Sequence, residues 1–228
     1  MAEHPAGVLY VVAVPLGNPD DITVRALKVL QTVELVACED TRRTGLLLSG
    51  LGIKKTLTSF HSHTTLLKTG RIVEALRKGS AVALLTDCGT PGVSDPGAAL
   101  VREALDAGID VVPVPGPSAL AAALSVSGFA GSGVFFAGFF SPKAGKRRRQ
   151  LAEAAAAAQV VACYESPHRV RKLLEEVLET LGDGEVVLCR EMSKTHEEFV
   201  RGRAEVLLQR GFTEKGEFTV LINTAKKT

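Results

Sequence analysis

Short apolar runs alternate with amphipathic segments along the whole chain, and this alternation constrains the fold most. The run at 8–14 is continuously apolar, as expected of a strand buried on both faces of a sheet. Similar runs recur at 33–38, 81–86, 110–114, 134–139, 159–164, 185–190 and 217–223, and a short strand is expected at 57–60. Segments with helical character lie between them, for example at 97–107 and 168–181. The pattern predicts an α/β class with mostly parallel sheets.

The most conformationally restricted segment of the chain, rich in proline, lies near its middle. Pro113, Pro115, Gly116 and Pro117 lie within five residues of one another, at the end of the predicted strand 110–114. About five predicted strands precede this segment and about four follow it, enough for one sheet on each side. We therefore expect two α/β domains, at 1–115 and 116–228.

Composition excludes several classes of protein. Of the 228 residues, 46% are hydrophobic and 23% are charged, which is ordinary for a globular protein. The longest apolar runs have strand length, so we expect no membrane span. Residues 1–7 lack the pattern of a secretory signal, which favours a cytoplasmic location. Residues 1–115 carry 11 basic and 12 acidic side chains and residues 116–228 carry 16 and 13, so a polyanion would favour the second half.

No metal site is predicted. The four cysteines are widely spaced and form no C-x-x-C pair, which favours reduced thiols over a zinc site or a disulfide framework. His61 and His63 could ligate a metal, but the sequence places no third ligand beside them.

Ligands of open α/β sheets bind beyond the carboxyl ends of the strands, so the loops there are the places to examine. The loop at 15–19 lacks both G-x-G-x-x-G and the GK[ST] of a phosphate-binding loop, which disfavours a dinucleotide or ATP site. The loop at 87–97 has three glycines, two prolines and two aspartates. Turn chemistry alone rarely needs so much fixed backbone, so we expect a pre-shaped wall for a ligand. The segment at 114–119 is either a rigid linker or a ligand contact at the start of a helix.

Charged loops follow other predicted strands, at 39–43, 164–169 and 190–198. Their residues could handle a polar substrate, or could be helix caps and surface ion pairs. Five cations also crowd the start of a predicted helix at 143–149, where they oppose the positive end of the helix dipole. An external phosphate would explain them, although a solvated charge run is the alternative.

Eight segments of the chain, taken in order, resemble a known family. They are VAVPLGNPDDIT, ACEDTRRT, SFHSHT, LLTDCGTPGVSDPG, VPGPSA, GFFSPKAGKR, YESPHRV and REMSKTHEEFVRG. Together they span essentially the whole chain and resemble the ribosomal RNA small-subunit methyltransferase I family, within the tetrapyrrole methylase superfamily. The resemblance implies two α/β domains with S-adenosylmethionine in a cleft between them, a homodimer, and 2′-O-methylation of a decoding-centre cytidine of 16S rRNA in the 30S subunit.

The resemblance also implies positions for the site. The residues expected to bind the cofactor are Pro15, Asp87, Cys88, Gly89, Thr90, Val93, Ser118, Ala119, Glu165 and Met192. A base or a cation beside the ribose 2′-OH would assist methyl transfer. The candidates are Glu39, Asp40, Glu165, Arg190, Glu191 and Lys194, and the sequence does not choose among them. The residues expected to contact RNA are Arg42, Lys143, Lys146, Arg147, Arg148, Arg149 and Arg169.

Two other functions stay open at this point. The same fold could methylate a corrinoid or another small molecule, or could bind RNA without catalysis. Tetrapyrrole-modifying members carry G-G-D-P in the second loop, whereas this chain has C-G-T-P at 88–91, which favours the RNA branch.

Overall fold

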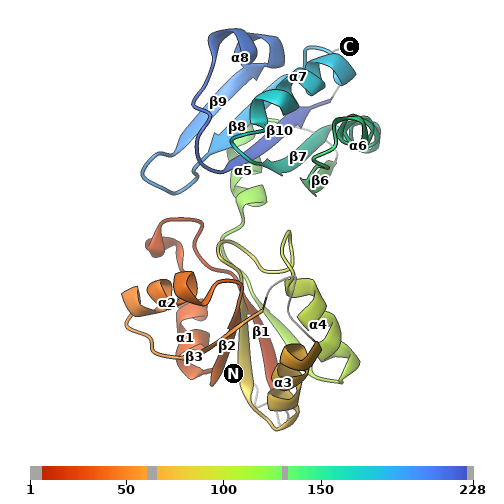
Figure 1. Ribbon diagram of the computed structural model, residues 1–228. Coiled ribbons are helices and arrows are strands. Elements are labelled where there is room, and N and C mark those ends of the chain that lie inside the picture. The colour runs from red at the N-terminus through yellow and green to blue at the C-terminus, as the bar shows by residue number, and fades with distance from the viewer. Residues whose placement is uncertain (1–6, 61–65, 130–132, 225–228) are drawn as a thin grey trace. The chain divides into compact units, whose positions relative to one another are not determined.

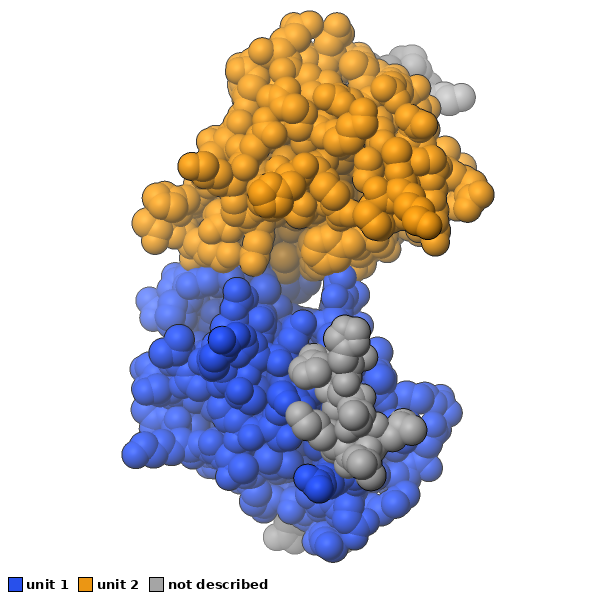
Figure 2. Space-filling view, viewed as in Figure 1, with its two compact units in different colours: residues 1–118 blue, residues 119–228 orange. Residues whose placement is uncertain are grey.

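The computed structural model describes residues 7–60, 66–129 and 133–224. The chain divides into two compact units, residues 1–118 and 119–228, coloured separately in Figure 2. Each unit has its own sheet and its own buried core. The predicted α/β class is confirmed. No helix in the described part of the chain is both long and apolar enough to cross a membrane.

Unit 1 is built on a parallel sheet. In its described residues the sheet has five strands in the order β3-β2-β4-β1-β5. The strands are β1 (Val8–Val12), β2 (Leu35–Cys38), β3 (Thr56–Ser59), β4 (Ala81–Leu85) and β5 (Asp110–Val114). All four pairings are parallel, as predicted. The carboxyl ends of these strands therefore meet at one edge of the sheet.

Helices cover both faces of this sheet, as Figure 1 shows. The elements are η1 (Pro19–Asp21), α1 (Val24–Thr32), α2 (Thr41–Gly50), α3 (Leu66–Arg77) and α4 (Gly97–Asp106). Buried side chains of α1 and α2 pack on one face of the strands, and those of α3 and α4 pack on the other. Both faces of the central strands are thus buried, which explains their continuous apolar sequence.

Unit 2 contains a second sheet with a different pattern. Its elements are α5 (Ala119–Ser127), β6 (Val134–Phe139), α6 (Ala144–Ala157), β7 (Val160–Glu165), α7 (Val170–Leu181), β8 (Glu185–Arg190), β9 (Glu198–Arg203), α8 (Ala204–Arg210) and β10 (Phe218–Asn223). The strand order is β6-β7-β10-β8-β9. Only β6 and β7 pair in parallel among the described strands, and the other three pairings are antiparallel. The expectation of mostly parallel sheets is corrected here, because β10 runs opposite to both of its neighbours.

The second sheet also has two covered faces. Side chains of α6, α7 and α8 pack on one face in the larger core of this unit. The other face packs against α5 through a smaller cluster that includes Ala123, Met192 and Leu221. Since β7 and β8 both run antiparallel to β10, the carboxyl ends of β6, β7 and β8 meet at one edge of the sheet.

Candidate functional site

Three loops at the carboxyl edge of unit 1 are joined into one wall. They follow the adjacent strands β4, β1 and β5. Val14 and Gly89 exchange two backbone hydrogen bonds, of 2.9 and 3.0 Å, which join the loops after β1 and β4. The hydroxyl of Thr90 donates to the carbonyl oxygen of Pro117 at 2.9 Å, which joins the loops after β4 and β5. The loop singled out by its glycines is therefore held on both sides.

Two glycines allow these loops to approach so closely. Gly89 has φ +79°, and a Cβ there would lie 3.3 Å from Cδ2 of Leu16. A Cβ on Gly116 would lie 3.0 Å from the Cβ of Ala13. A larger residue at either position would crowd these neighbouring side chains. Main chain rather than side chain thus forms much of this surface.

Asp95 fixes the second half of the loop after β4. Its carboxylate accepts hydrogen bonds from the N–H groups of Gly92, at 2.8 Å, and Gly97, at 2.7 Å. These bonds join the middle of the loop to the first residue of α4. Asp95 was not among the predicted site residues. Its sequence context could have indicated this role, because an aspartate two residues before a glycine that starts a helix commonly forms such a turn.

A polar cluster joins the loop after β2 to the loop after β4. Asp87 accepts a hydrogen bond from the backbone N–H of Asp40 at 3.1 Å and pairs with Arg43 at 3.3 Å. The Thr86 hydroxyl donates to Glu39 at 3.2 Å. Asp87 therefore has two protein partners with which any ligand must compete. Arg43 was not among the predicted site residues, and the sequence alone did not distinguish it from Arg42.

Asp40 is the N-cap of α2, so it has the structural role of a helix cap. Its carboxylate accepts from the Arg42 backbone N–H at 2.8 Å and pairs with the Arg42 guanidinium at 2.9 Å. The hydrogen bond from the Arg42 side chain, together with that from its backbone, lowers the pKa of Asp40 to about 2. A carboxylate with so low a pKa is a weak proton acceptor. The Arg42 side chain projects into solvent but is already paired.

Glu165 and Arg169 form the corresponding pair at the carboxyl edge of unit 2. Oε1 of Glu165 accepts from the Ser166 N–H and from Nε of Arg169, both at 2.7 Å. The Glu165 side chain is fully buried, and Oε2 has no hydrogen-bond partner among the described residues. Burying a carboxylate oxygen without a donor is costly. This oxygen could accept a hydrogen bond from a ligand.

The loop after β8 is strained on both sides of Met192. Glu191 has φ +49° and Ser193 has φ +59°, a left-handed conformation that residues other than glycine rarely adopt. Met192 itself is buried against Ala123 and Leu221. Such strain persists only where surrounding contacts enforce it, and it is concentrated at functional loops.

Charged contacts enforce this conformation. The Glu191 carboxylate accepts from the Glu217 N–H at 2.8 Å and from the Lys194 ammonium at 3.1 Å. Burial raises the pKa of Glu191, but these two donors together lower it below its ordinary value. Burial likewise lowers the pKa of Lys194, and its hydrogen bonds to Glu217 and Glu191 outweigh this and raise it. Both groups are therefore charged at neutral pH.

Arg190, the last residue of β8, is anchored in the same loop. Its Nη1 donates to the His196 carbonyl oxygen at 2.7 Å. Its Nε lies 3.2 Å from the Glu198 carboxylate, in an ion pair without hydrogen-bond geometry. The predicted residues Arg190, Glu191, Met192 and Lys194 are thus brought together in one folded loop.

The structure corrects one residue of the basic stretch. Arg147 was expected to contact phosphate, but it is only 4% exposed. Its Nη2 donates to Oε1 of Glu176 at 2.9 Å, and Nη1 donates to the carbonyls of Ser141 and Pro142 at 3.3 Å. The hydrogen bond to Glu176 raises the pKa of Arg147. All three nitrogens are used inside the protein, so none is available to RNA.

The other four cations of this stretch are exposed. Arg148 lies 3.3 Å from Glu179, and Arg149 lies 3.8 Å from Glu153. Lys143 and Lys146 have no ion pair among the described residues. All three arginines of the stretch thus have a carboxylate partner within the protein, so the helix dipole alone does not require an external phosphate here.

Metal ligands do not gather in the described part of the chain, where no group of three His, Cys, Asp or Glu could hold an ion. His61 and His63 lie outside the described residues. Cys38, Cys163 and Cys189 are buried, and Cys88 is exposed on the loop after β4. Burial raises the pKa of Cys189 to about 12, as expected of an inert thiol.

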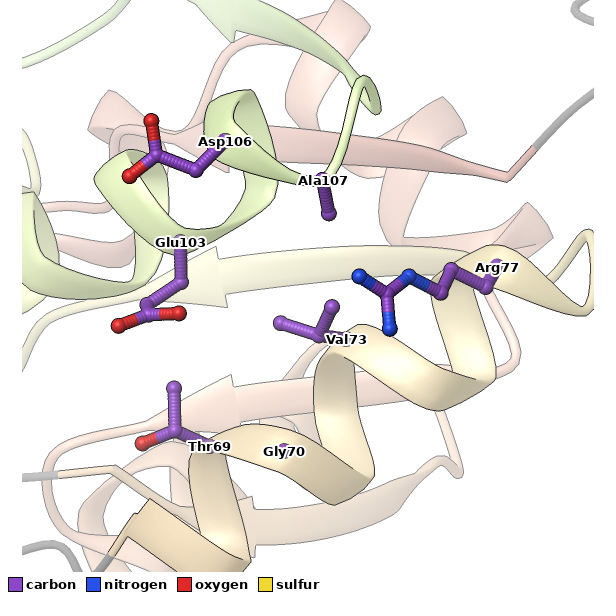
Figure 3. Close-up of a pocket in the computed structure, with 7 residues that line it drawn as sticks. All are labelled: Thr69, Gly70, Val73, Arg77, Glu103, Asp106 and Ala107. Atoms are coloured by element: carbon purple, nitrogen blue, oxygen red, sulfur yellow. The ribbon is translucent and has the colours of Figure 1, made fainter.

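A shallow pocket on unit 1 lies apart from these loops (Figure 3). Thr69, Val73 and Arg77 of α3 face Glu103 and Asp106 of α4 across it. Its volume of about 240 Å³ is below the range of typical ligand pockets. It includes none of the residues predicted for the site, and no function is assigned to it.

Comparison with solved structures supports the fold. A uroporphyrin-III C-methyltransferase from Thermus thermophilus aligns with a TM-score of 0.68 at 23% identity, covering 96% of this chain and 94% of that protein. The cobalt precorrin-4 methyltransferase CbiF aligns with a TM-score of 0.65 at 21% identity, covering 95% and 94%. At these identities the likeness concerns the fold alone.

Comparison of sequences identifies the family. The model for Tetrapyrrole (Corrin/Porphyrin) Methylases matches residues 8–207. A protein of Thermotoga maritima named ribosomal RNA small subunit methyltransferase I is 44% identical, over 95% of this chain and 98% of that protein. The protein of the same name from Haemophilus influenzae is 42% identical, over 97% and 80%. The chain therefore belongs to the tetrapyrrole methylase family, and within it to the group of ribosomal RNA small subunit methyltransferase I.

Proposed function

We propose that the protein transfers a methyl group from S-adenosylmethionine to the ribose 2′-oxygen of a decoding-centre cytidine in 16S rRNA. The relatives named ribosomal RNA small subunit methyltransferase I support the substrate class. The observation that carries the cofactor is the wall of three joined loops at the carboxyl edge of unit 1. A ligand that binds through main chain needs such a fixed and closely packed surface.

The residues at the wall fit an adenosyl cofactor. Gly92 is exposed, carries no side chain and has positive φ, so a ligand can approach its backbone, whereas Gly89 is buried and holds the wall together through its two hydrogen bonds to Val14. Pro15 and Thr90 shape the wall, and Cys88 and Val93 are exposed on it. Ser118 and Ala119 stand at the start of α5. In unit 2, the proposed cofactor residues are Glu165, whose buried Oε2 has no hydrogen-bond partner among the described residues, and Met192, which is buried on the strained loop.

When bound, S-adenosylmethionine supplies a methyl group activated by its sulfonium charge. The protein must exclude water, orient the ribose and accept the proton that leaves the 2′-hydroxyl. The lowered pKa values of Asp40 and Glu191 make both poor proton acceptors. Glu39, whose carboxylate accepts from the Thr86 hydroxyl, is the stronger candidate in unit 1. Arg190 and Lys194 would stabilise negative charge on the 2′-oxygen.

RNA would be held mainly by charge. We assign phosphate contacts first to Lys143 and Lys146, which have no internal ion pair among the described residues. Arg42, Arg148, Arg149 and Arg169 would have to exchange a carboxylate partner for phosphate. Arg147 is excluded from this set by its burial. We further propose that the enzyme acts on the 30S subunit in the cytoplasm and is a homodimer.

The cofactor site is tested by filling it. Gly89→Val should abolish S-adenosylmethionine binding measured by titration calorimetry, because the new side chain meets Leu16 in the wall. Gly108→Val is the matched control, since Gly108 also has positive φ, +71°, but has no atom within 4 Å of an added Cβ. Equal binding by a folded Gly89→Val variant would refute the assignment of the wall.

The substrate is tested with labelled cofactor. The wild-type protein should transfer labelled methyl to 30S subunits and not to uroporphyrinogen or corrinoid substrates. Transfer to the tetrapyrroles alone would favour a small-molecule enzyme of the same fold. Binding of 30S subunits without any transfer would identify a non-catalytic relative, and either outcome would contradict the proposal.

A further inference from the structure

A bulge in β6 redirects one aromatic side chain. The pairing of β6 with β7 shifts in register between Phe136 and Phe139, and Gly138 between them has φ +60°. In a regular strand, residues three apart face opposite sides of the sheet. Here both phenylalanines contact Tyr164 of β7 edge to face, with ring centroids 5.0 and 5.7 Å away. The bulge therefore places Phe139 on the same face as Phe136.

Phe139 contributes little to the core, despite this arrangement. The residue is 56% exposed, whereas Phe140 beside it is buried against the opposite face of the sheet. An exposed phenylalanine gains little hydrophobic stabilisation, and a glycine inside a strand, such as Gly138, adds an entropic cost of folding. Folding alone does not explain why the strand presents this ring to solvent.

The ring lies a few residues before the basic start of α6 in the chain. Lys143 follows Phe139 by four residues, a reach of at most about 14 Å along the chain. The intervening segment is fixed, because Arg147 donates to the carbonyls of Ser141 and Pro142, and Gln150 accepts from the Ser141 N–H at 3.0 Å. An exposed aromatic ring and Lys143, which has no ion pair among the described residues, thus lie at the two ends of one fixed segment at the carboxyl edge of the sheet, with Lys146 in the first turn of α6.

We propose that Phe139 and Tyr164 form a stacking platform for an unpaired base of the RNA substrate, with Lys143 and Lys146 holding the adjacent phosphates. The inference rests on the proposed function and identifies the residues that bind its RNA substrate. Aromatic rings bind single-stranded bases by stacking, and neighbouring cations neutralise the backbone. The positive charge beside the ring favours a nucleic acid over an apolar protein partner. A base bound here would be recognised by stacking on its ring face rather than by hydrogen bonds to its edge, so binding would be largely independent of base identity.

The test compares single-stranded with duplex RNA. Phe139→Ala in the full chain should weaken binding of a short single-stranded oligoribonucleotide by about 5- to 150-fold, the range for loss of one stacked base. Duplex RNA of the same sequence should bind equally to variant and wild type. Phe139→Tyr keeps the ring and should bind within about twofold of wild type, whereas Phe139→Leu should not. Phe135→Ala is the matched control, since Phe135 is 40% exposed on the same strand but precedes the bulge.

Methylation of 30S subunits distinguishes failure of the stacking platform from failure of the proposed function. Phe139→Ala should bind the cofactor as tightly as wild type does, but its KM for 30S subunits should be higher. If wild type methylates 30S subunits and Phe139→Ala does so equally well, the platform is refuted and the function stands. If wild type binds and methylates no RNA, both fail. Dissociation of a dimer by Phe139→Ala, seen by sedimentation, would assign the ring to a second copy and overturn the platform.

Discussion

Removing the buried Arg147 side chain should destabilise unit 2 strongly, and the size of the effect can be worked from its partner. The Glu176 side chain is 0% exposed, and its two oxygens accept from two nitrogens of Arg147. Arg147→Met would leave that carboxylate buried without a cation. Breaking a buried pair on one side costs about 3–5 kcal/mol, a large part of the stability of a small domain.

Two further variants isolate the cause. Arg147→Met combined with Glu176→Leu removes both charges and should recover most of the loss, because apolar pairs often replace buried ion pairs without penalty. Arg148→Met is the control on the same helix. Arg148 and Glu179 are about half exposed, so this change should cost no more than about 1 kcal/mol.

Urea unfolding can be followed in unit 2 alone. The chain has no tryptophan and two tyrosines, Tyr10 in unit 1 and Tyr164 in unit 2. In a Tyr10→Phe background, tyrosine fluorescence therefore reports only the second unit. The free energy of unfolding follows from linear extrapolation. An Arg147→Met variant within 1 kcal/mol of its parent, or one no worse than Arg148→Met, would refute the reasoning.

Four other outcomes are expected from the described contacts. Alkylation of the folded protein should modify exposed Cys88 and spare the buried cysteines, and saturating S-adenosylmethionine should slow it; an unchanged rate would contradict the cofactor wall. Arg42→Ala should raise the pKa of Asp40 from about 2 towards 3.8, measured by NMR titration. The stability that this pair contributes is present above pH 3.8 and lost as pH falls towards 2, so the variant should lose that acid dependence. In thermal or urea unfolding, Ser193→Gly should be neutral or stabilising by up to about 1 kcal/mol, because it relieves a left-handed φ. Gly216→Ala should destabilise, because its Cβ would lie 2.5 Å from Cγ of Glu191; a neutral result would mean that the loop gives way.

Apolar runs with sharp boundaries were predictable from sequence. The strands at 110–114, 134–139 and 185–190 have the bounds that their hydrophobic runs indicated. β9 and α8 were missed, because the segment Glu198–Arg203 alternates weakly and Gly202 interrupts it. Without those two elements, the direction of β10 could not be inferred. The mixed character of the second sheet is a property of its connections rather than of any one strand.

The sequence predicted which loops form the candidate site, but not the contacts of the individual side chains. Helical spacing could have revealed Arg147, since Leu151 and Ala154 follow it at i+4 and i+7 and are buried on the same face. The bulge that exposes Phe139 has no comparable signal. A regular period of two assigns Phe136 and Phe139 to opposite faces, and only the conformation of Gly138 changes this. Ion pairs between distant loops, such as that of Arg43 with Asp87, depend on strand order.

The central place of β10 has a consequence for synthesis on the ribosome. The sheet of unit 1 is complete once residue 114 has emerged, whereas β7 and β8 share no neighbour until residues 218–223 appear between them. At about 5–20 residues per second, synthesis from the end of β7 to the end of β10 takes roughly 3–12 s, during which the nascent second unit carries unpaired strand edges. Strand edges of this kind invite pairing with other chains. The second unit would thus be the aggregation-prone and chaperone-dependent half of the nascent protein, and a premature stop before residue 218 would release it in that state.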